Sequence, residues 1–178
     1  MFKPLKLDLD FAPYLIADYG DTGTSCIKHQ VYELTDIHQD YGGFPDSYNI
    51  HNTKIYQLWW SQDQIDYNML GKQLNMKVVT VSTIKQPPGS VVPFHRDTFF
   101  QISKRYPERT ELKVRANIYM ENYHMGHFIQ YVLDGKYETS TNWQAGEGFL
   151  WNSDILHLSC NGGFKDKYTM QVSGFLNK

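Results

Sequence analysis

The sequence has only two cysteines, Cys26 and Cys160, among its 178 residues. Two are too few for the disulfide framework of a small secreted domain. One bridge between them is possible, but two reduced thiols in the cytoplasm are the simpler interpretation. No apolar stretch approaches the roughly 20 residues that span a bilayer, and the N-terminus lacks the apolar core of a signal peptide. We therefore expect a soluble, cytoplasmic protein without a membrane partner.

An excess of charge of one sign is also missing. The formal net charge is −2 and the pI is about 6.4, so nothing steers the protein towards a polyanion, and a nucleic-acid partner is not expected. Hydrophobic residues make up 41% of the chain, which excludes a disordered protein. The 13 Tyr and 10 Phe favour β-strands, where flat rings pack on a pleated surface.

The chain length fits a single domain over residues 1–178. Alternating apolar residues from Leu5 to Phe11 indicate a first strand, and we expect a second short strand near residues 29–34. Residues 61–74 are the best helix, with Ser61 and Gln64 in the pattern of a capping box. The remaining elements are a run of strands: 78–84, 91–97, 112–120, 127–133, 136–141, 148–151 and 167–175.

This order of elements predicts a mainly β fold. The strands from about residue 77 to 178 would form a double-stranded β-helix, a jelly-roll or cupin-type barrel. Residues 1 to about 76 would be its N-terminal helical buttress.

A candidate metal site combines His95, Asp97 and His157. A histidine and a carboxylate two residues apart on a strand point to the same face. A histidine from a distant strand then completes a set of two imidazoles and one carboxylate, which suits Fe(II) because it leaves coordination positions open. A second pair of this kind, His38 and Asp40, with His95 as its distant ligand, lies among turn formers and is the weaker alternative.

A candidate anchor for an acidic co-substrate follows ten residues after His157. Lys167 and Thr169 share one face of their predicted strand, and a cation beside a hydroxyl can hold a carboxylate. The alternative is a strand whose polar face meets water.

Arg115, Asn117 and Tyr119 also share one face of a predicted strand. Arg115 is either a second cation for the co-substrate or the partner of Glu111 or Asp97. Asn117 and Tyr119 are candidates for contact with the co-substrate. His124 and His127, three residues apart, are interpreted as surface or substrate-lining residues in preference to metal ligands.

Three segments resemble the Fe(II)/2-oxoglutarate-dependent oxygenases: residues 87–97 (PPGSVVPFHRD), 115–119 (RANIY) and 143–161 (WQAGEGFLWNSDILHLSCN). Within that superfamily the sequence looks most like the aspartyl/asparaginyl β-hydroxylase-like branch and small oxygenases of phage type. The resemblance covers about residues 78–176. It departs from the branch in having Lys167 where arginine is more frequent. It also has Asp97, a carboxylate that animal members of the branch often lack.

The resemblance implies that His95, Asp97 and His157 bind Fe(II) and are the catalytic centre, and that Lys167 binds the distal carboxylate of 2-oxoglutarate. It also implies an enzyme that uses O2 to hydroxylate a protein side chain or small molecule, with succinate and CO2 as co-products. Asp97 argues against a halogenase, which needs that position for halide. The alternative is a non-oxygenase cupin-type protein that binds a metal or ligand without chemistry. The substrate would be selected by the N-terminal part and by two loops, residues 101–110 and 121–126.

Overall fold

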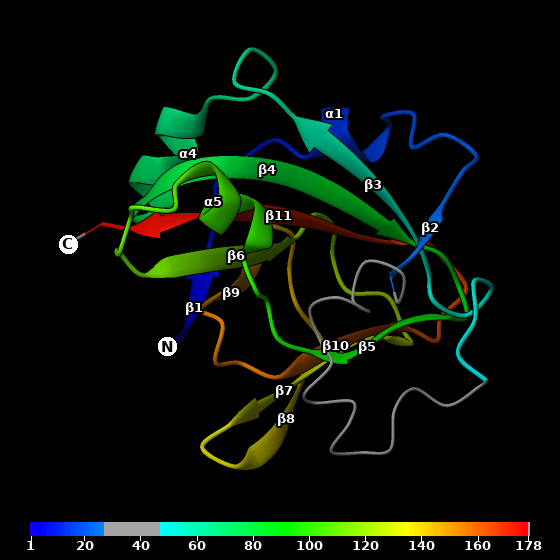
Figure 1. The fold of residues 1–178 in the computed structure, drawn as a ribbon. Helices are drawn as coiled ribbons and strands as arrows, with labels where there is room; N and C mark the ends of the chain where they lie inside the picture. Colours follow the sequence, from blue (N-terminus) through cyan, green and yellow to red (C-terminus); the bar gives the residue numbers. More distant parts are fainter. Residues whose placement is uncertain (27–46, 178) are drawn as a thin grey trace.

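Two antiparallel sheets form the computed structural model, which describes residues 1–26 and 47–177 (Figure 1). The larger sheet has, in spatial order, β1 (Phe2–Lys6), β9 (Glu147–Trp151), β6 (Lys113–Tyr119), β11 (Lys167–Leu176), β4 (Met76–Gln86), β3 (Lys54–Trp60) and β2 (Thr24–Ser25). The smaller sheet has β5 (Ser90–His95), β10 (His157–Asn161), β7 (His127–Leu133) and β8 (Lys136–Ser140). This arrangement confirms the mainly β, jelly-roll fold predicted from the sequence.

Three short helices accompany the sheets in the described part of the chain: α1 (Ala12–Leu15), α4 (Tyr67–Leu74) and α5 (Phe100–Arg105). In Figure 1, α1 and α4 lie on the outer side of the large sheet, away from the small sheet. Buried apolar side chains of α1 and α4, among them Tyr14, Leu70 and Leu74, pack there against Val81 and Val172 of the sheet. A large apolar core therefore lies outside the space between the sheets and leaves the inner face available for polar residues.

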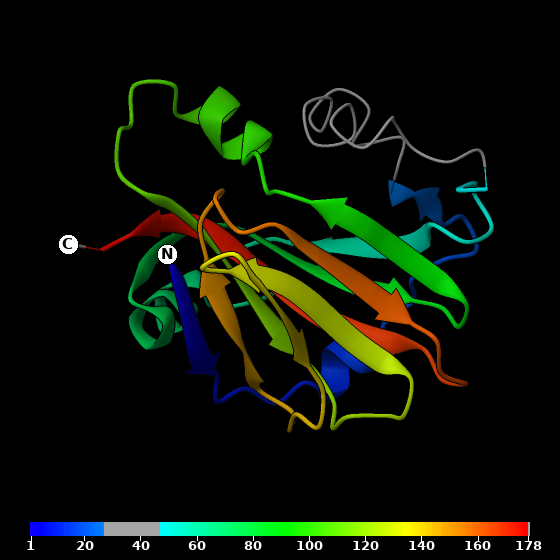
Figure 2. The same ribbon diagram turned by 90° about the horizontal axis from the view of Figure 1, so that it is seen from below.

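The inner face of the large sheet carries polar side chains in neighbouring rows. Strands β6 and β11 pair in a register that places Asn117 beside Gln171 and Arg115 beside Ser173. Since successive side chains alternate between faces, these residues share the face opposite Ala116 and Val172. The view in Figure 2 shows the small sheet lying across this face.

Several predicted elements differ from those observed. The helix predicted for residues 61–74 begins only at Tyr67, because Asp66 is its N-cap and accepts hydrogen bonds from the amides of Asn68 and Met69. Ser61 and Gln64 do bond to each other, but within a turn that precedes the helix.

The first strand ends at Lys6, whereas the alternating pattern continues to Phe11. Strands β3 and β10 and helix α5 were not among the predicted elements, and α5 occupies part of the expected loop 101–110. The strand expected near residues 29–34 and the pair His38 and Asp40 lie outside the described residues. None of the described helices has the length and apolar character needed to cross a membrane.

Candidate metal centre

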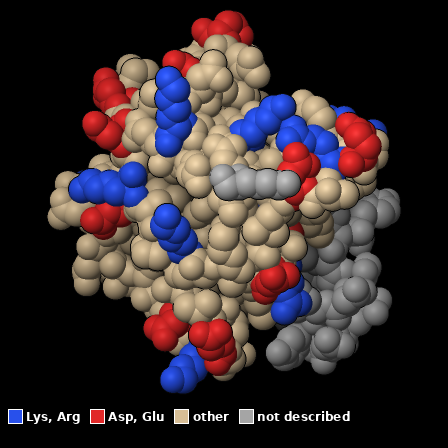
Figure 3. Space-filling model, turned by 90° about the vertical axis from the view of Figure 1, so that its left-hand side faces the viewer, with Lys and Arg blue, Asp and Glu red and all other residues tan. Residues whose placement is uncertain are grey.

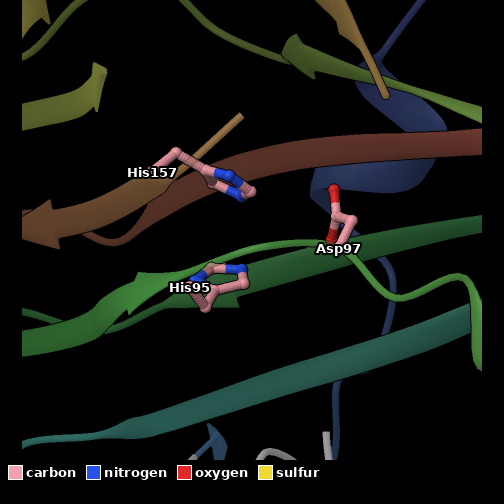
Figure 4. Close-up of side chains that lie close together, drawn as sticks. All are labelled: His95, Asp97 and His157. Carbon is pink, nitrogen blue, oxygen red and sulfur yellow. The ribbon is translucent and has the colours of Figure 1, made fainter. Parts of the chain in front are cut away.

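Three side chains converge between the two sheets (Figure 4). His95 is the last residue of β5 and pairs directly with His157, the first residue of β10. Asp97 is the last residue of the predicted strand 91–97, but β5 ends at His95, so Asp97 lies two residues beyond the observed strand. One potential ligand atom from each of the three residues lies within 4.8 Å of the others. The sequence-predicted metal ligands are therefore brought together.

The two imidazoles are oriented by backbone carbonyls. Nδ1 of His95 lies 2.8 Å from the oxygen of Pro93, and Nδ1 of His157 lies 3.0 Å from the oxygen of Ile155. A carbonyl only accepts, so each Nδ1 carries the proton and each Nε2 keeps a lone pair. Burial lowers the pKa of both rings, and burial together with the neighbouring His157 lowers that of His95 to about 3. Both histidines are thus neutral, the form that binds metals.

Both oxygens of the Asp97 carboxylate are held from the large sheet. Trp151 of β9 donates its Nε1–H to Oδ2 at 2.8 Å, and Arg115 of β6 pairs with Oδ1. Burial by itself would raise the pKa of Asp97, but the Arg115 guanidinium and the hydrogen bond from Trp151 act against it and the pKa lies below its usual value. The carboxylate is therefore ionised as well as oriented, as a metal ligand requires.

Arg115 also donates from Nε to Ser173 Oγ at 3.0 Å. Of the two roles expected for it from the sequence, the ion pair with Asp97 is the contact that the structure places there. Glu111, the other expected partner, instead pairs with Arg109.

A cavity of about 700 Å³ opens from the triad. Its walls include all three potential ligands and, from the inner face of the large sheet, Asn117 and Thr169. The Oδ1 of Asn117 accepts a hydrogen bond from Gln171 Nε2 at 3.0 Å, whereas its buried Nδ2 has no partner within residues 1–26 and 47–177. A buried donor without an acceptor is costly, so this position fits a ligand that brings an oxygen.

Lys167 is a buried cation, 2% exposed, behind the cavity wall. Its Nζ donates to Ser159 Oγ at 2.7 Å and to the carbonyl oxygens of Phe128 at 2.8 Å and Cys160 at 3.3 Å. It forms no ion pair with an acidic residue in the described ranges 1–26 and 47–177. Burial without a counter-charge lowers the pKa of Lys167 to about 7.

Similarity to known proteins is found in the structure of the chain and not in its sequence. No protein-family model matches the chain, and no curated protein sequence matches it. Among solved structures, a prolyl-4-hydroxylase from Pseudomonas putida is 13% identical with a TM-score of 0.57, the alignment covering 98% of this chain and 92% of that one. A viral collagen prolyl hydroxylase from Paramecium bursaria Chlorella virus-1, solved with 2-oxoglutarate, is 12% identical with a TM-score of 0.53, covering 99% and 96%.

The chain therefore shares its fold with these two prolyl hydroxylases. A 2-oxoglutarate-dependent epimerase from nogalamycin biosynthesis shares this fold at 8% identity and a TM-score of 0.57, covering 98% of this chain and 77% of that one. An oxygenase fold therefore does not by itself specify the reaction.

Other predicted residues occupy structural positions within the oxygenase fold. Tyr119 stacks on Trp143 with ring centroids 3.8 Å apart and donates its hydroxyl to Ser140 at 3.0 Å. Tyr119 is not one of the residues that line the cavity, and burial raises its pKa. His127 faces the carbonyl of Lys165 at 3.0 Å, and neither it nor His124 joins the cluster of potential ligands.

Two contributors were not recognised from the sequence. Trp151 was given no role of its own in the sequence, yet its indole N–H donates to Asp97 Oδ2. Ser159 was not singled out, although it lies two residues after His157 and so on the same face of β10. The strand period would have identified Ser159, whereas the role of Trp151 depends on which strands pair.

Proposed function

We propose that the protein is an Fe(II)- and 2-oxoglutarate-dependent dioxygenase that acts as a single domain over residues 1–178. It hydroxylates a small molecule or a protein side chain and releases succinate and CO2. The observation that carries the proposal is the convergence of two neutral imidazoles and one ionised carboxylate on one point of a cavity. A buried lysine, Lys167, contacts Ser159 on the wall of that cavity and has no acidic partner among the described residues.

His95, Asp97 and His157 would hold the iron. Two imidazoles and a carboxylate leave positions open, which favours non-haem Fe(II) over a closed structural zinc site. The bound iron would supply the oxidising chemistry, together with O2 and 2-oxoglutarate. The chain's own contribution is to keep both histidines neutral and to hold Asp97 through Arg115 and Trp151.

Lys167 would bind the distal carboxylate of 2-oxoglutarate. Lys167 contacts Ser159, which lies on the wall of the same cavity two residues beyond His157. Thr169 lies on the same face of β11 as Lys167 and also lines the cavity. A carboxylate that replaced one of the three neutral acceptors of Nζ would supply the counter-charge that the lysine lacks among the described residues. Asn117 Nδ2 would donate to an oxygen of the same co-substrate, which would satisfy its missing hydrogen bond. Arg115 would act on Asp97 rather than on the co-substrate, and Tyr119 would support the wall.

Cys26 and Cys160 are not joined in a disulfide. Two thiols in this state fit the reducing cytoplasm, where the enzyme would work.

The proposal is tested by adding Fe(II) and 2-oxoglutarate to the protein without oxygen. We expect a weak visible absorption band that neither component gives alone. His95→Ala should abolish the band, because a ligand is lost. His124→Ala is the matched control and should leave it unchanged, since His124 lies outside the cluster. A folded wild-type protein that binds iron but gives no band would instead favour the non-oxygenase cupin-type function.

A further inference from the structure

The charged residues that line the cavity are strongly biased towards one sign. They are Arg96, Arg105, Arg115 and Asp97. Arg115 and Asp97 neutralise each other. Among the described residues, the remaining charge on the walls of the cavity is therefore positive, although the protein as a whole is slightly acidic.

Arg105 is the cation best placed to meet a ligand. It is exposed on α5 and forms no hydrogen bond or ion pair with any residue in the described part of the chain. Arg96, in contrast, already donates its Nε–H to the backbone oxygen of Asp154 at 3.2 Å. A guanidinium presents several N–H groups in a plane and pairs well with carboxylates and phosphates.

Two large aromatic side chains line the same cavity and are exposed. Trp59 at the end of β3 is 58% exposed and Phe100 at the start of α5 is 53% exposed. Exposed rings next to a polar cavity offer a large flat contact area at little cost in side-chain entropy. The amides of Gln57 and Gln101 lie on the same walls and add hydrogen-bonding groups.

We propose that the primary substrate is a small molecule with a planar ring and an anionic group, a carboxylate or a phosphate. The ring packs on Trp59 or Phe100 and the anion pairs with Arg105. This inference rests on the proposed function only in placing the substrate in the same cavity. A cavity of about 700 Å³ is within the range that accommodates a drug-sized ligand.

The distribution of charge on one face of the molecule argues for a small acid rather than a polyanion. On the face shown in Figure 3, basic and acidic side chains are interspersed, and no broad area of one sign is visible. A polynucleotide would need an extended basic track, whereas a single anionic group needs only one or two cations.

Binding is measured by equilibrium dialysis of the metal-free protein with matched pairs of probes. One pair is adenosine monophosphate and adenosine, and the other is N-acetylphenylalanine and its amide. The two members of a pair have the same ring, and only one of them carries an anionic group. We expect the anionic member of at least one pair to bind about tenfold more tightly, the effect of one charge-assisted hydrogen bond. The pair with the larger preference identifies phosphate or carboxylate.

Variants assign the two contacts. Arg105→Gln should abolish the preference for the anion, while Lys104→Gln, which removes the neighbouring cation of α5, should leave it intact. Phe100→Ala or Trp59→Ala should weaken both members of a pair several-fold. Phe164→Ala is the control for loss of an exposed ring, because Phe164 is 90% exposed and does not line the cavity.

The inference is overturned if no probe binds, if the charged and neutral members bind equally, or if Arg105→Gln keeps the preference. These measurements need no iron, 2-oxoglutarate or oxygen. A protein that lacks oxygenase activity can therefore still satisfy them, and one that forms the Fe(II)–2-oxoglutarate band can still fail them.

Discussion

A lysine exposed to water is protonated at neutral pH, but the burial of Lys167 in the folded protein opposes its charge. Its pKa of about 7 in the folded protein compares with about 10.4 for an unfolded lysine. Between these values the unfolded chain binds one proton more than the folded chain, so stability increases as pH rises. Below pH 7 both states are protonated, and the full cost of burying the charge, several kcal/mol, is present.

We therefore predict that the ligand-free protein becomes more stable between pH 7 and about pH 10. Lys167→Met should flatten this rise, because the titrating group is removed. The difference between the two proteins isolates Lys167 from the tyrosines and cysteines that also titrate there. Urea unfolding of both proteins at several pH values measures it, with Lys104→Met as a control for an exposed lysine. Parallel profiles for wild type and Lys167→Met would contradict the prediction.

At the scale of elements, helix α4 begins after the N-cap Asp66, whereas the capping box predicted from the sequence begins at Ser61. The Asp66 carboxylate accepts from the amides of Asn68 at 2.8 Å and Met69 at 3.0 Å, which would otherwise lack partners. Asp66→Ala should cost about 1 kcal/mol of unfolding free energy, whereas Ser61→Ala should cost less because Ser61 only closes a turn. Urea unfolding of the two variants decides between them, and a larger loss for Ser61→Ala would restore the original assignment of the cap.

Strand β11 was predictable because the polar residues Lys167, Thr169 and Gln171 alternate along it with apolar ones. Strand β7 has the predicted bounds, and β11 differs by one residue at its end. Strand β3 was not predicted; its apolar residues lie on both faces, with Ile55 on one side and Leu58 on the other. Helix α5 was missed because it has six residues and no side-chain cap, and it starts after Phe99 in a left-handed conformation. Such an element depends on tertiary packing rather than on a local signal.

The candidate site was predictable to a similar extent. The spacing of His95, Asp97 and His157 needs only the strand period and a returning strand. The contacts of Arg115 and Trp151 with Asp97 could not be predicted, because they depend on the pairing of β6 with β9, which places Arg115 opposite Trp151. Pairing of strands 30 or more residues apart leaves no signal in a single sequence.

At the scale of the whole molecule, the candidate site joins the two sheets. His95 and His157 belong to the small sheet, while Asp97 is held by Arg115 and Trp151 of the large sheet. A metal bound by all three would connect the sheets through Asp97. Since metal binds only the folded arrangement, a concentration 100 times the dissociation constant should stabilise the protein by about 2.7 kcal/mol.

This coupling can be tested without altering the ligands. Trp151→Phe removes the hydrogen bond to Asp97 but keeps an aromatic ring and the net charge, so we predict that Mn(II) affinity falls about tenfold. At a fixed Mn(II) concentration, the rise in thermal midpoint should therefore be smaller than in wild type. Trp143→Phe is the matched control, because it also trims a buried indole but one that does not contact Asp97. If both variants lost the same amount of Mn(II) stabilisation, the effect would come from packing, and the hydrogen bond between Trp151 and Asp97 would have no particular part in metal binding.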